Sequence, residues 1–399
     1  MKKIGLVLFL FFITSFAFSQ GHIKKFEFSG LKRTRESYLL KVLKKYVGTE
    51  FNEETSKAME KDLREEGLFS EIAIQDEPDG NGGTSVKITL KEKISFLVLP
   101  FGSYTNDGPM GGAAMLDQNA FGIRDTFLLG GMIAKDSFTV MSSYRRPSLD
   151  ATHPGFSASG AYSKEKTKIA DLDGDTMYKI DNGRLHLELE INDRVFPCLV
   201  ASFGVGYTGN YFKDKDLDNI HQVLFNPSVK YSSSDWNGVF TSEKSLEVSL
   251  YGGCNNDGDF VTAEKIKGCF QQPIVSRLRF AVEACLSYEK EKAVINQQTR
   301  SNVSTNLLPS DFHSPEMLSS GFSLELAALQ TKYAMLSIYG AWQIVISEDY
   351  DGSTDFSYGP GGGLRVYLST INLPAVGVGL YYNIPHHVFE FGVSMGVSF

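Results

Sequence analysis

The most regular feature of the sequence is an alternation of apolar and polar residues that begins after Lys93 and continues to the C-terminus. It is clearest in the last segment, where the apolar residues are Phe389, Phe391, Val393, Met395, Val397 and Phe399, separated by small or polar residues that include Gly392 and Gly396. Other segments place Leu278, Phe280 and Val282 opposite Arg279 and Glu283, and Phe322, Leu324 and Leu326 opposite Ser323 and Glu325. Because side chains with a period of two lie on opposite faces of a β-strand, we expect residues 94–399 to be β-strands.

This alternation predicts about sixteen strands, an even number. Their approximate spans are 94–104, 109–118, 125–135, 137–145, 155–164, 176–191, 198–212, 221–233, 244–255, 262–273, 276–290, 317–328, 333–347, 355–369, 374–384 and 387–399. Several exceed the ~5–6 residues of an ordinary strand. They reach the ~9–11 residues with which a tilted strand crosses a membrane.

The connections between the expected strands also alternate. Those after the fifth, seventh, eleventh and thirteenth strands are long and polar, and the longest runs from Glu291 to Pro315. The connections after the sixth, tenth, twelfth and fourteenth strands are short. If both chain ends lie in the periplasm, the long connections lie outside and the short ones in the periplasm. The exceptions are the tight turns near Asp136 and Pro385, which would lie outside, and the longer segment Ser234–Glu243, which would lie in the periplasm. A soluble sandwich would share the period of two, but long loops at one end and short turns at the other are typical of membrane barrels. We therefore predict a mainly β fold, a transmembrane antiparallel β-barrel over residues 94–399.

Residues 20–93 have a different pattern, which predicts one small α/β domain of the order β-α-α-β-β. The expected elements are a strand at Ile23–Phe28, helices at Glu36–Tyr46 and Glu53–Glu66, and strands at Phe69–Gln75 and Val86–Leu90. Asn52 or Thr55 can cap the second helix, and Gly48 and Gly67 are suitable helix ends. The polar, glycine-rich segment 76–85 predicts a hairpin loop.

Residues 1–19 predict a cleaved signal peptide. Two lysines precede an uncharged run from Ile4 to Phe18, and the small residues Ala17 and Ser19 precede a cut before Gln20. This is the order of a secretory signal. After residue 20 no apolar run approaches the ~18 residues of a membrane helix. We expect an exported mature chain.

Composition and charge exclude some classes of protein. The chain has 399 residues, of which 42% are hydrophobic and 22% charged, so a disordered chain is not expected. Its net charge of −8 argues against a nucleic-acid partner, which would require a basic face. Residues 21–93 hold 14 basic and 14 acidic residues, whereas residues 94–399 hold 23 basic and 33 acidic residues, a net charge of −10.

No pattern predicts an active site, a metal site or a cofactor site. The seven histidines are scattered, and we expect His386 and His387 in a surface turn. The segment 171–176 faintly resembles a calcium loop, but Asn182 stands where the bidentate Glu belongs, so we expect a solvated loop. We therefore expect no enzymatic activity.

The four cysteines, Cys198, Cys254, Cys269 and Cys285, all lie in the barrel region. An exported protein can carry disulfides. Cys269 and Cys285 point to the same side of adjacent expected strands, but a short hairpin near Val275 would pair Cys269 with about Ala281. The spacing therefore gives no support for a Cys269–Cys285 bridge, and the sequence leaves the disulfide state of the four cysteines open.

The first domain resembles a POTRA domain over its whole length. The resemblance rests on the order of elements and on the segments IKKFEFSGLKRT, LREEGLFSEIAI and VKITLKEK, with the glycine at position 48. It implies a periplasmic docking module that binds extended chains by adding a strand to a sheet edge. In this family the edge is the strand after the second helix, which implies docking at Ser70, Glu71, Ile72, Ala73, Ile74 and Gln75.

The mature chain as a whole resembles the BamA-type superfamily of outer-membrane barrels, which includes the two-partner secretion transporters. The barrel segments that carry this resemblance are GGAAMLDQNAFGIRDTFLLG, GPGGGLRVYL and the ending FEFGVSMGVSF. Two features depart from the family. Its long sixth outer loop, which folds into the barrel, carries an Arg-Gly-aromatic motif, whereas Arg300 here precedes Ser301. This chain also has one POTRA module, where BamA typically has several.

The resemblance implies a bacterial outer-membrane protein with its POTRA domain in the periplasm, which inserts or translocates clients through the barrel or its lateral seam. It assigns the C-terminal barrel signal and seam to Phe389, Phe391, Gly392, Val393, Met395, Gly396, Val397 and Phe399. The implied partners are unfolded outer-membrane or secreted proteins, outer-membrane lipid, and periplasmic chaperones or accessory lipoproteins. The alternatives are a two-partner-type secretion pore and a non-catalytic surface antigen or porin with a vestigial POTRA domain.

Overall fold

The computed structural model describes residues 22–79, 83–105, 108–148, 153–196, 198–214, 216–236, 239–290, 295, 297–300, 302–331, 334–350, 352–368 and 376–395. These residues divide into two compact units. Unit 1 contains the chain up to Ser95 together with Asn119–Arg124, and unit 2 contains Phe96–Gln118 and the chain from Asp125 onward. The predicted signal peptide lies outside the described residues.

Unit 1 has the predicted order β-α-α-β-β, which is confirmed. Its elements are β1 (Ile23–Ser29), α2 (Glu36–Leu43), a 3-10 helix (Lys44–Tyr46), α3 (Glu53–Glu65), β2 (Phe69–Asp79) and β3 (Gly83–Glu92). The sheet order is β1-β3-β2, with β3 parallel to β1 and antiparallel to β2. The strands extend into the segment expected as a hairpin loop.

The core of unit 1 forms where the apolar face of each helix meets one face of the sheet. Its fully buried side chains are Leu39, Leu43, Met59, Leu63, Val86 and Ile88. Asn52 caps α3, because its Oδ1 accepts a hydrogen bond of 2.8 Å from the backbone N of Thr55. Gly67 follows α3 with a φ of 74°, a conformation that favours glycine.

Residues Asn119–Arg124 contain the Asn-x-Phe-Gly segment noted in the sequence. Within unit 1, Asn119 Nδ2 donates to Thr34 Oγ1 at 2.9 Å, and the backbone N of Arg35 donates to the carbonyl O of Gly122 at 2.9 Å. A Cβ on Gly122 would lie 2.3 Å from the carbonyl O of Arg33, and its φ is 77°. Glycine is therefore required at this position.

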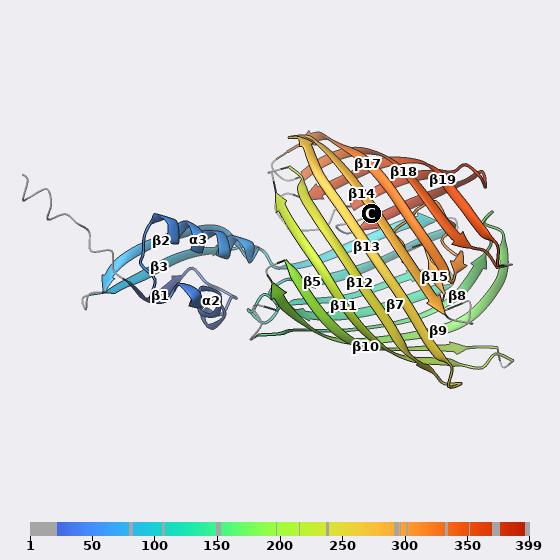
Figure 1. Ribbon diagram of the computed structural model, residues 1–399, viewed down its shortest axis with the longest axis horizontal. Helices are drawn as coiled ribbons and strands as arrows, with labels where there is room; N and C mark the ends of the chain where they lie inside the picture. Colours follow the sequence, from blue (N-terminus) through green and yellow to red (C-terminus); the bar gives the residue numbers. More distant parts are fainter. Residues whose placement is uncertain are drawn as a thin grey trace, which may run out of the picture. The chain divides into compact units, whose positions relative to one another are not determined.

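Unit 2 is a 16-stranded antiparallel sheet that curls into a barrel (Figure 1). Its strands are β4 (Phe96–Thr105), β5 (Gly108–Asp117), β6 (Thr126–Ala134), β7 (Ser137–Arg146), β8 (Gly155–Ala170), β9 (Thr176–Phe196), β10 (Leu199–Phe212), β11 (Ile220–Trp236), β12 (Thr241–Asn255), β13 (Phe260–Val275), β14 (Leu278–Lys290), β17 (Glu316–Gln330), β18 (Ala334–Glu348), β19 (Thr354–Leu368), β20 (Val376–Asn383) and β21 (Val388–Met395). Each strand pairs with its neighbours in chain order, and β4 and β21 lie at the two ends of the sheet. All sixteen predicted strands are confirmed.

The two faces of the sheet differ as a membrane barrel requires. On β17, Phe322, Leu324 and Leu326 are 52%, 48% and 48% exposed, whereas Glu325 between them is 1% exposed. A soluble sandwich would bury the apolar face and expose the polar one. Here the apolar face is outside and the polar face is inside, which is the arrangement of a transmembrane barrel.

No helix among the described residues has the length and apolar character needed to cross a membrane.

The connections between strands form two groups, one at each end of the barrel. The loop end carries the connections 135–136, 171–175, 256–259 and 384–387, with the described residues of 213–219, 291–315 and 349–353. The turn end carries the described residues of the connections that alternate with these along the chain. The longer segment expected at Ser234–Glu243 is corrected, because β11 continues to Trp236 and β12 begins at Thr241. Only residues 237–240 connect these two strands.

Candidate functional site

The longest loop, between β14 and β17, folds into the interior of the barrel. We call residues 297–300 and 302–315 of this loop the inner loop. It contains the short paired strands β15 (Gln298–Thr299) and β16 (His313–Ser314). Its apolar side chains Val303, Leu307, Leu308 and Phe312 are fully buried, and they pack with inward-facing wall residues Cys285, Met317, Tyr339, Val345 and Tyr381. Burial of these apolar side chains stabilises the position of the loop inside the barrel, although most of its other residues are polar.

Arg300 connects the inner loop to the last described strand. Its Nη1 donates to the carbonyl O of Leu308 at 2.9 Å and to Oε2 of Glu390 on β21 at 2.6 Å. The two side chains are 20% and 11% exposed, so this is a partly buried ion pair. The family motif is absent from the sequence, yet the arginine still holds the loop against the barrel wall.

The predicted C-terminal residues lie partly within the described chain. Phe389 and Phe391 are exposed on the outer face, opposite to Glu390, and Gly392, Val393 and Met395 pair through their backbones with Gly379, Val378 and Val376 of β20. Gly396, Val397 and Phe399 lie outside the described residues. Their role as a barrel signal stays a prediction.

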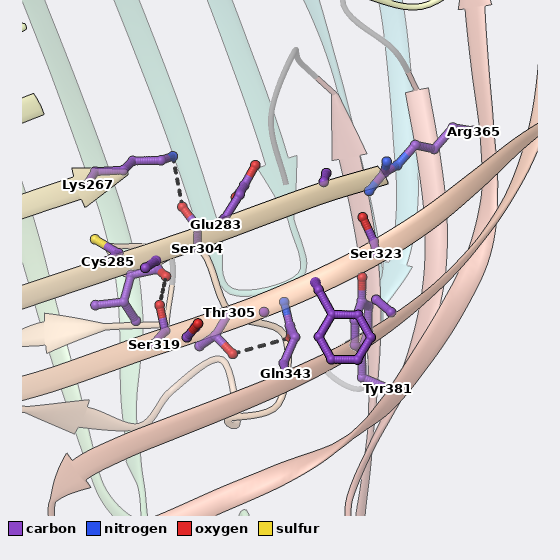
Figure 2. Close-up of a pocket in the computed structure, with 17 residues that line it drawn as sticks. Lys267, Glu283, Cys285, Ser304, Thr305, Ser319, Ser323, Gln343, Arg365 and Tyr381 are labelled. Carbon is purple, nitrogen blue, oxygen red and sulfur yellow. Dashed lines mark hydrogen bonds between the residues drawn. The ribbon is translucent and has the colours of Figure 1, made fainter. Parts of the chain in front are cut away.

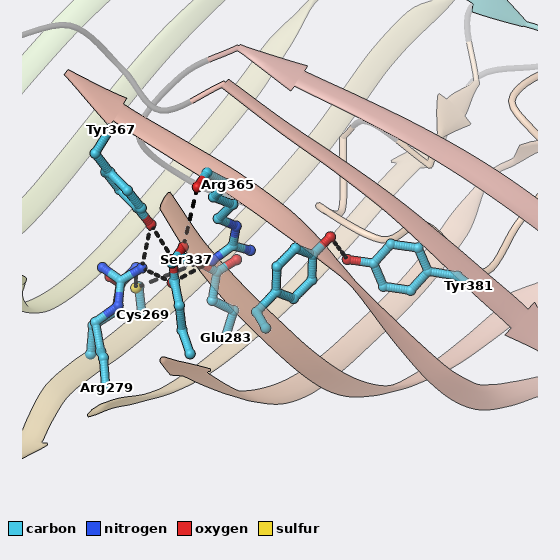
Figure 3. Close-up of polar contacts among 10 residues, drawn as sticks. Cys269, Arg279, Glu283, Ser337, Arg365, Tyr367 and Tyr381 are labelled. Carbon is cyan, nitrogen blue, oxygen red and sulfur yellow. Dashed lines mark hydrogen bonds and ion pairs between the residues drawn. The ribbon is translucent and has the colours of Figure 1, made fainter. Parts of the chain in front are cut away.

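A buried charge cluster lies on the inner wall near the turn end (Figure 3). Glu325 on β17 forms ion pairs with Arg279 on β14 and with Arg365 on β19, the second at 2.8 Å. The hydroxyl groups of Ser337 and Tyr367 also donate to Glu325, the latter at 2.7 Å. Both carboxylate oxygens of Glu325 therefore accept hydrogen bonds from groups that the strand register holds in place.

The surroundings of this cluster extend it toward the inner loop. Arg279 Nη1 donates to Gln271 Oε1 at 2.7 Å. The guanidinium carbon of Arg365 lies 4.1 Å from the centre of the Tyr339 ring, and the hydroxyl groups of Tyr339 and Tyr381 are 3.1 Å apart. Tyr381 in turn packs with the inner loop. A continuous row of side-chain contacts thus joins the charge cluster to the inner loop.

A cavity lies between the inner loop and the wall (Figure 2). Its lining includes Lys267, Glu283, Cys285, Ser304, Thr305, Ser319, Gln343, Arg365 and Tyr381. Lys267 Nζ donates to Ser304 Oγ at 3.0 Å, and Gln343 Oε1 accepts from the backbone N of Asn306 at 3.0 Å. These contacts hold the loop in place. Among the described residues, no group of three or more His, Cys, Asp or Glu side chains is placed to hold a metal ion.

Loops from distant parts of the chain meet at the loop end. His386 contacts Asp173 through Nδ1 and Asp355 through Nε2, both at 3.0 Å. Tyr350 Oη donates to the carbonyl O of Ala170 at 3.0 Å, and its ring contacts Phe312 of the inner loop. Burial raises the pKa of Tyr350 to about 12, so this phenol stays protonated as a donor.

We expected residues 171–176 in a solvated loop and His386 in a surface turn. The structure adds that these two segments contact each other. Asp171 Oδ1 accepts from the backbone N of Asp175 at 2.8 Å, which closes the loop as a turn, and Asp173 binds His386. Burial lowers the pKa of His386, but the hydrogen bonds that its ring donates to the carboxylates of Asp355 and Asp173 outweigh burial and raise the pKa above its usual value of 6.5. No local pattern indicates this contact, because Asp173 and His386 lie 213 positions apart.

The strand β2 of unit 1 holds the residues that the sequence assigns to client docking. It lies at an edge of the sheet order β1-β3-β2. Ser70, Glu71, Ala73 and Gln75 are exposed, whereas Ile72 and Ile74 are half-buried on the face of the core residues Leu90 and Ile88, with which they pair. Glu71 forms an ion pair with Lys91 on the exposed face.

All four cysteines are free thiols. The expected pairing of Cys269 with about Ala281 is wrong, because Cys269 pairs with Glu283 and Ala281 pairs with Gln271. The register differs by two residues since β14 begins at Leu278 and the β13–β14 ladder is irregular between Pro273 and Val275. Cys269 is the donor of a 3.8 Å contact to Glu283 Oε1.

Comparison with known proteins identifies unit 1 and shows which known structures share the fold of the chain. Residues 21–93 match the family model of the POTRA domain, described as surface antigen variable number repeat. The chain is similar to the structure of BamA from Haemophilus ducreyi lacking POTRA domains 1–3, with 14% identity, a TM-score of 0.61, and coverage of 93% of this chain and 83% of that one. No curated protein sequence matches it.

Two further structures are similar over nearly the whole chain. CdiB from Escherichia coli has 12% identity and a TM-score of 0.69, covering 94% of this chain and 75% of that one. CdiB from Acinetobacter baumannii has 13% identity and a TM-score of 0.64, covering 96% and 74%. Unit 1 is therefore a POTRA domain, and the chain has the fold of the BamA-type superfamily, with one POTRA domain and a sixteen-stranded barrel.

Proposed function

We propose that this protein inserts β-barrel proteins into the outer membrane or translocates them across it. In this proposal the POTRA domain and the turn end of the barrel face the periplasm, the loop end faces outward, and the apolar outer faces contact lipid. Unfolded outer-membrane or secreted proteins are the clients, and periplasmic chaperones or accessory lipoproteins deliver them. The mechanism consists of strand pairing and needs no covalent chemistry.

The observation that carries the proposal is the sheet edge at β4 and β21. These strands end the sheet order, and within the described part of the chain no ladder joins one to the other. An edge within lipid leaves backbone N–H and C=O groups without water, at a cost of several kcal/mol for each group. A client strand that pairs there removes this cost from both partners, so the edge favours the addition of strands.

The POTRA edge and the inner loop support the same mechanism. β2 offers exposed backbone to an extended client before it reaches the barrel. The ion pair between Arg300 and Glu390 holds the inner loop beside β21, so movement of the loop and opening of this edge are linked through one contact.

Depletion of the protein followed by proteomics of the outer-membrane fraction tests this function. We expect reduced levels of several other barrel proteins and loss of their heat-modifiable gel mobility. Unchanged levels and folding of every other outer-membrane protein would contradict the proposal.

The second candidate is a two-partner-type secretion pore, favoured by the similarity to two CdiB structures. It predicts one dedicated exported partner that is lost from the medium on depletion, while the other outer-membrane barrels are unaffected. The same depletion experiment therefore separates the two candidates.

A further inference from the structure

Phe240 lies inside the barrel although it belongs to a short connection at the turn end. It ends the connection between β11 and β12, and its side chain is 1% exposed. It packs with Ala327 on β17 and Met335 on β18, together with Val239 and Tyr367. Ala327, Met335 and Tyr367 face inward, because Leu326, Ile338 and Val366, which stand at odd-numbered separations from them on the same strands, are exposed on the outer face.

The groups around the ring form a site suited to an aromatic side chain. The guanidinium carbon of Arg279 lies 4.9 Å from the centre of the Phe240 ring, which is a cation–π contact. The Tyr367 ring meets it edge to face, at 6.3 Å and 84°. We call Arg279, Ala327, Met335 and Tyr367 the Phe240 site.

This site is held in its shape without help from Phe240. Arg279 donates to Gln271 and to Glu325, and Tyr367 donates to Glu325 at 2.7 Å (Figure 3). Ala327 and Met335 are fixed by the strands that carry them. The cluster around Glu325 therefore keeps the cation and the aromatic edge oriented whether or not a ring lies between them.

Phe240 reaches this site from a distant part of the wall. In the sheet order, β13 separates β12 from β14, and β17, β18 and β19 lie still farther along. A residue next to β12 that contacts side chains of β14, β17, β18 and β19 must extend inward across the turn end of the barrel interior.

We propose that Phe240 closes the turn end of the barrel by occupying an internal binding site for an aromatic side chain, and that the interior opens when the ring leaves this site. The inner loop packs against the wall in another part of the interior, where Phe240 makes no contact with its buried cluster. The closure by Phe240 does not depend on the proposed client, and it can be measured without one.

Thiol labelling of the full-length protein in detergent micelles tests the proposal. Cys269 faces the interior two positions from Gln271, which contacts Arg279, and Cys285 lies buried under the inner loop. The exposed Cys198 gives a reference rate. Labelling with a charged maleimide is followed at each cysteine by mass spectrometry. We expect Phe240→Ala to raise the rate at Cys269 relative to Cys198 several-fold, with Cys285 still protected.

Matched variants and a small aromatic probe complete the experiment. Phe203→Ala removes a ring of the same kind that is 52% exposed on the outer face, and it should leave the rate at Cys269 unchanged. Phe240→Leu keeps most of the volume without the π face and should give an intermediate rate. Indole added to Phe240→Ala should occupy the vacated site and lower the rate again.

An equal rate at Cys269 in the wild type and in both Phe240 variants overturns the proposal. The proposal is also overturned if both variants label Cys285 as well as Cys269 faster than the wild type does. Phe240 would then support the fold as a whole rather than close one end. Neither result would bear on whether the protein assembles outer-membrane clients.

Discussion

Arg300 of the inner loop and Glu390 of β21 form a 2.6 Å ion pair across 90 positions of sequence. The pair joins the inner loop to a strand at the end of the sheet. Since one arginine makes this contact and also binds the carbonyl O of Leu308, it fixes both the position of the loop and its internal shape.

Substitution of Arg300 should release the inner loop. We expect Arg300→Ala to lower the free energy of unfolding by about 1.5–3 kcal/mol, the usual contribution of a hydrogen bond to a charged group. Limited proteolysis should then cleave within 302–315, where the wild type resists. Arg300→Lys should retain part of the protection, and equal protection of the alanine variant would contradict the role assigned to this pair.

Removal of the Glu325 charge should be far more costly. Glu325→Gln leaves Arg279 and Arg365 buried without their counterion, and breaking a buried pair typically costs about 3–5 kcal/mol. Urea unfolding in detergent measures this loss. The control is Glu247→Gln, because Glu247 and Lys230 form a 3.2 Å pair with 39% and 51% exposed side chains, and such pairs contribute about 0–1 kcal/mol. Similar losses in both variants would contradict the prediction.

The contacts of His386 should make the loop end sensitive to pH. Because its folded pKa is raised above 6.5, the charged contacts with Asp173 and Asp355 are fully stabilising below pH 6.5 and are lost as the pH rises through the folded pKa. We expect proteolysis at 171–175 to accelerate over that rise. His386→Gln should remove the dependence, and a pH profile that this variant leaves unchanged would show that another group is responsible.

The edge strand β2 should contact extended clients. A photo-crosslinking residue at the exposed position 73 should capture unfolded outer-membrane proteins in cells, because an added strand would lie beside it. The matched position is Lys57 on α3, which is exposed but offers no sheet edge. Equal crosslinking at both positions would indicate nonspecific contact and contradict docking at β2.

The polar residues that form the interior were visible in the sequence, but their partners were not. Arg279 and Glu325 stand at alternate positions among apolar residues, which predicts that both face inward. Their contact depends on the stagger of β14 against β17, which pairs Arg279 with Glu325 across 46 positions. Phe240 gave no signal, since one aromatic residue after a strand has the same local pattern inside or outside the barrel.

The sequence by itself determined the strands, the two helices and the order of the units, because a period of two or of 3.6 depends only on residues near one another in the chain. It also determined which face of each strand is apolar. Only the tertiary structure decided that Arg300 meets Glu390, that His386 meets Asp173, and that Phe240 turns inward. These contacts depend on register and on the curl of the sheet, which bring together residues that no local pattern connects.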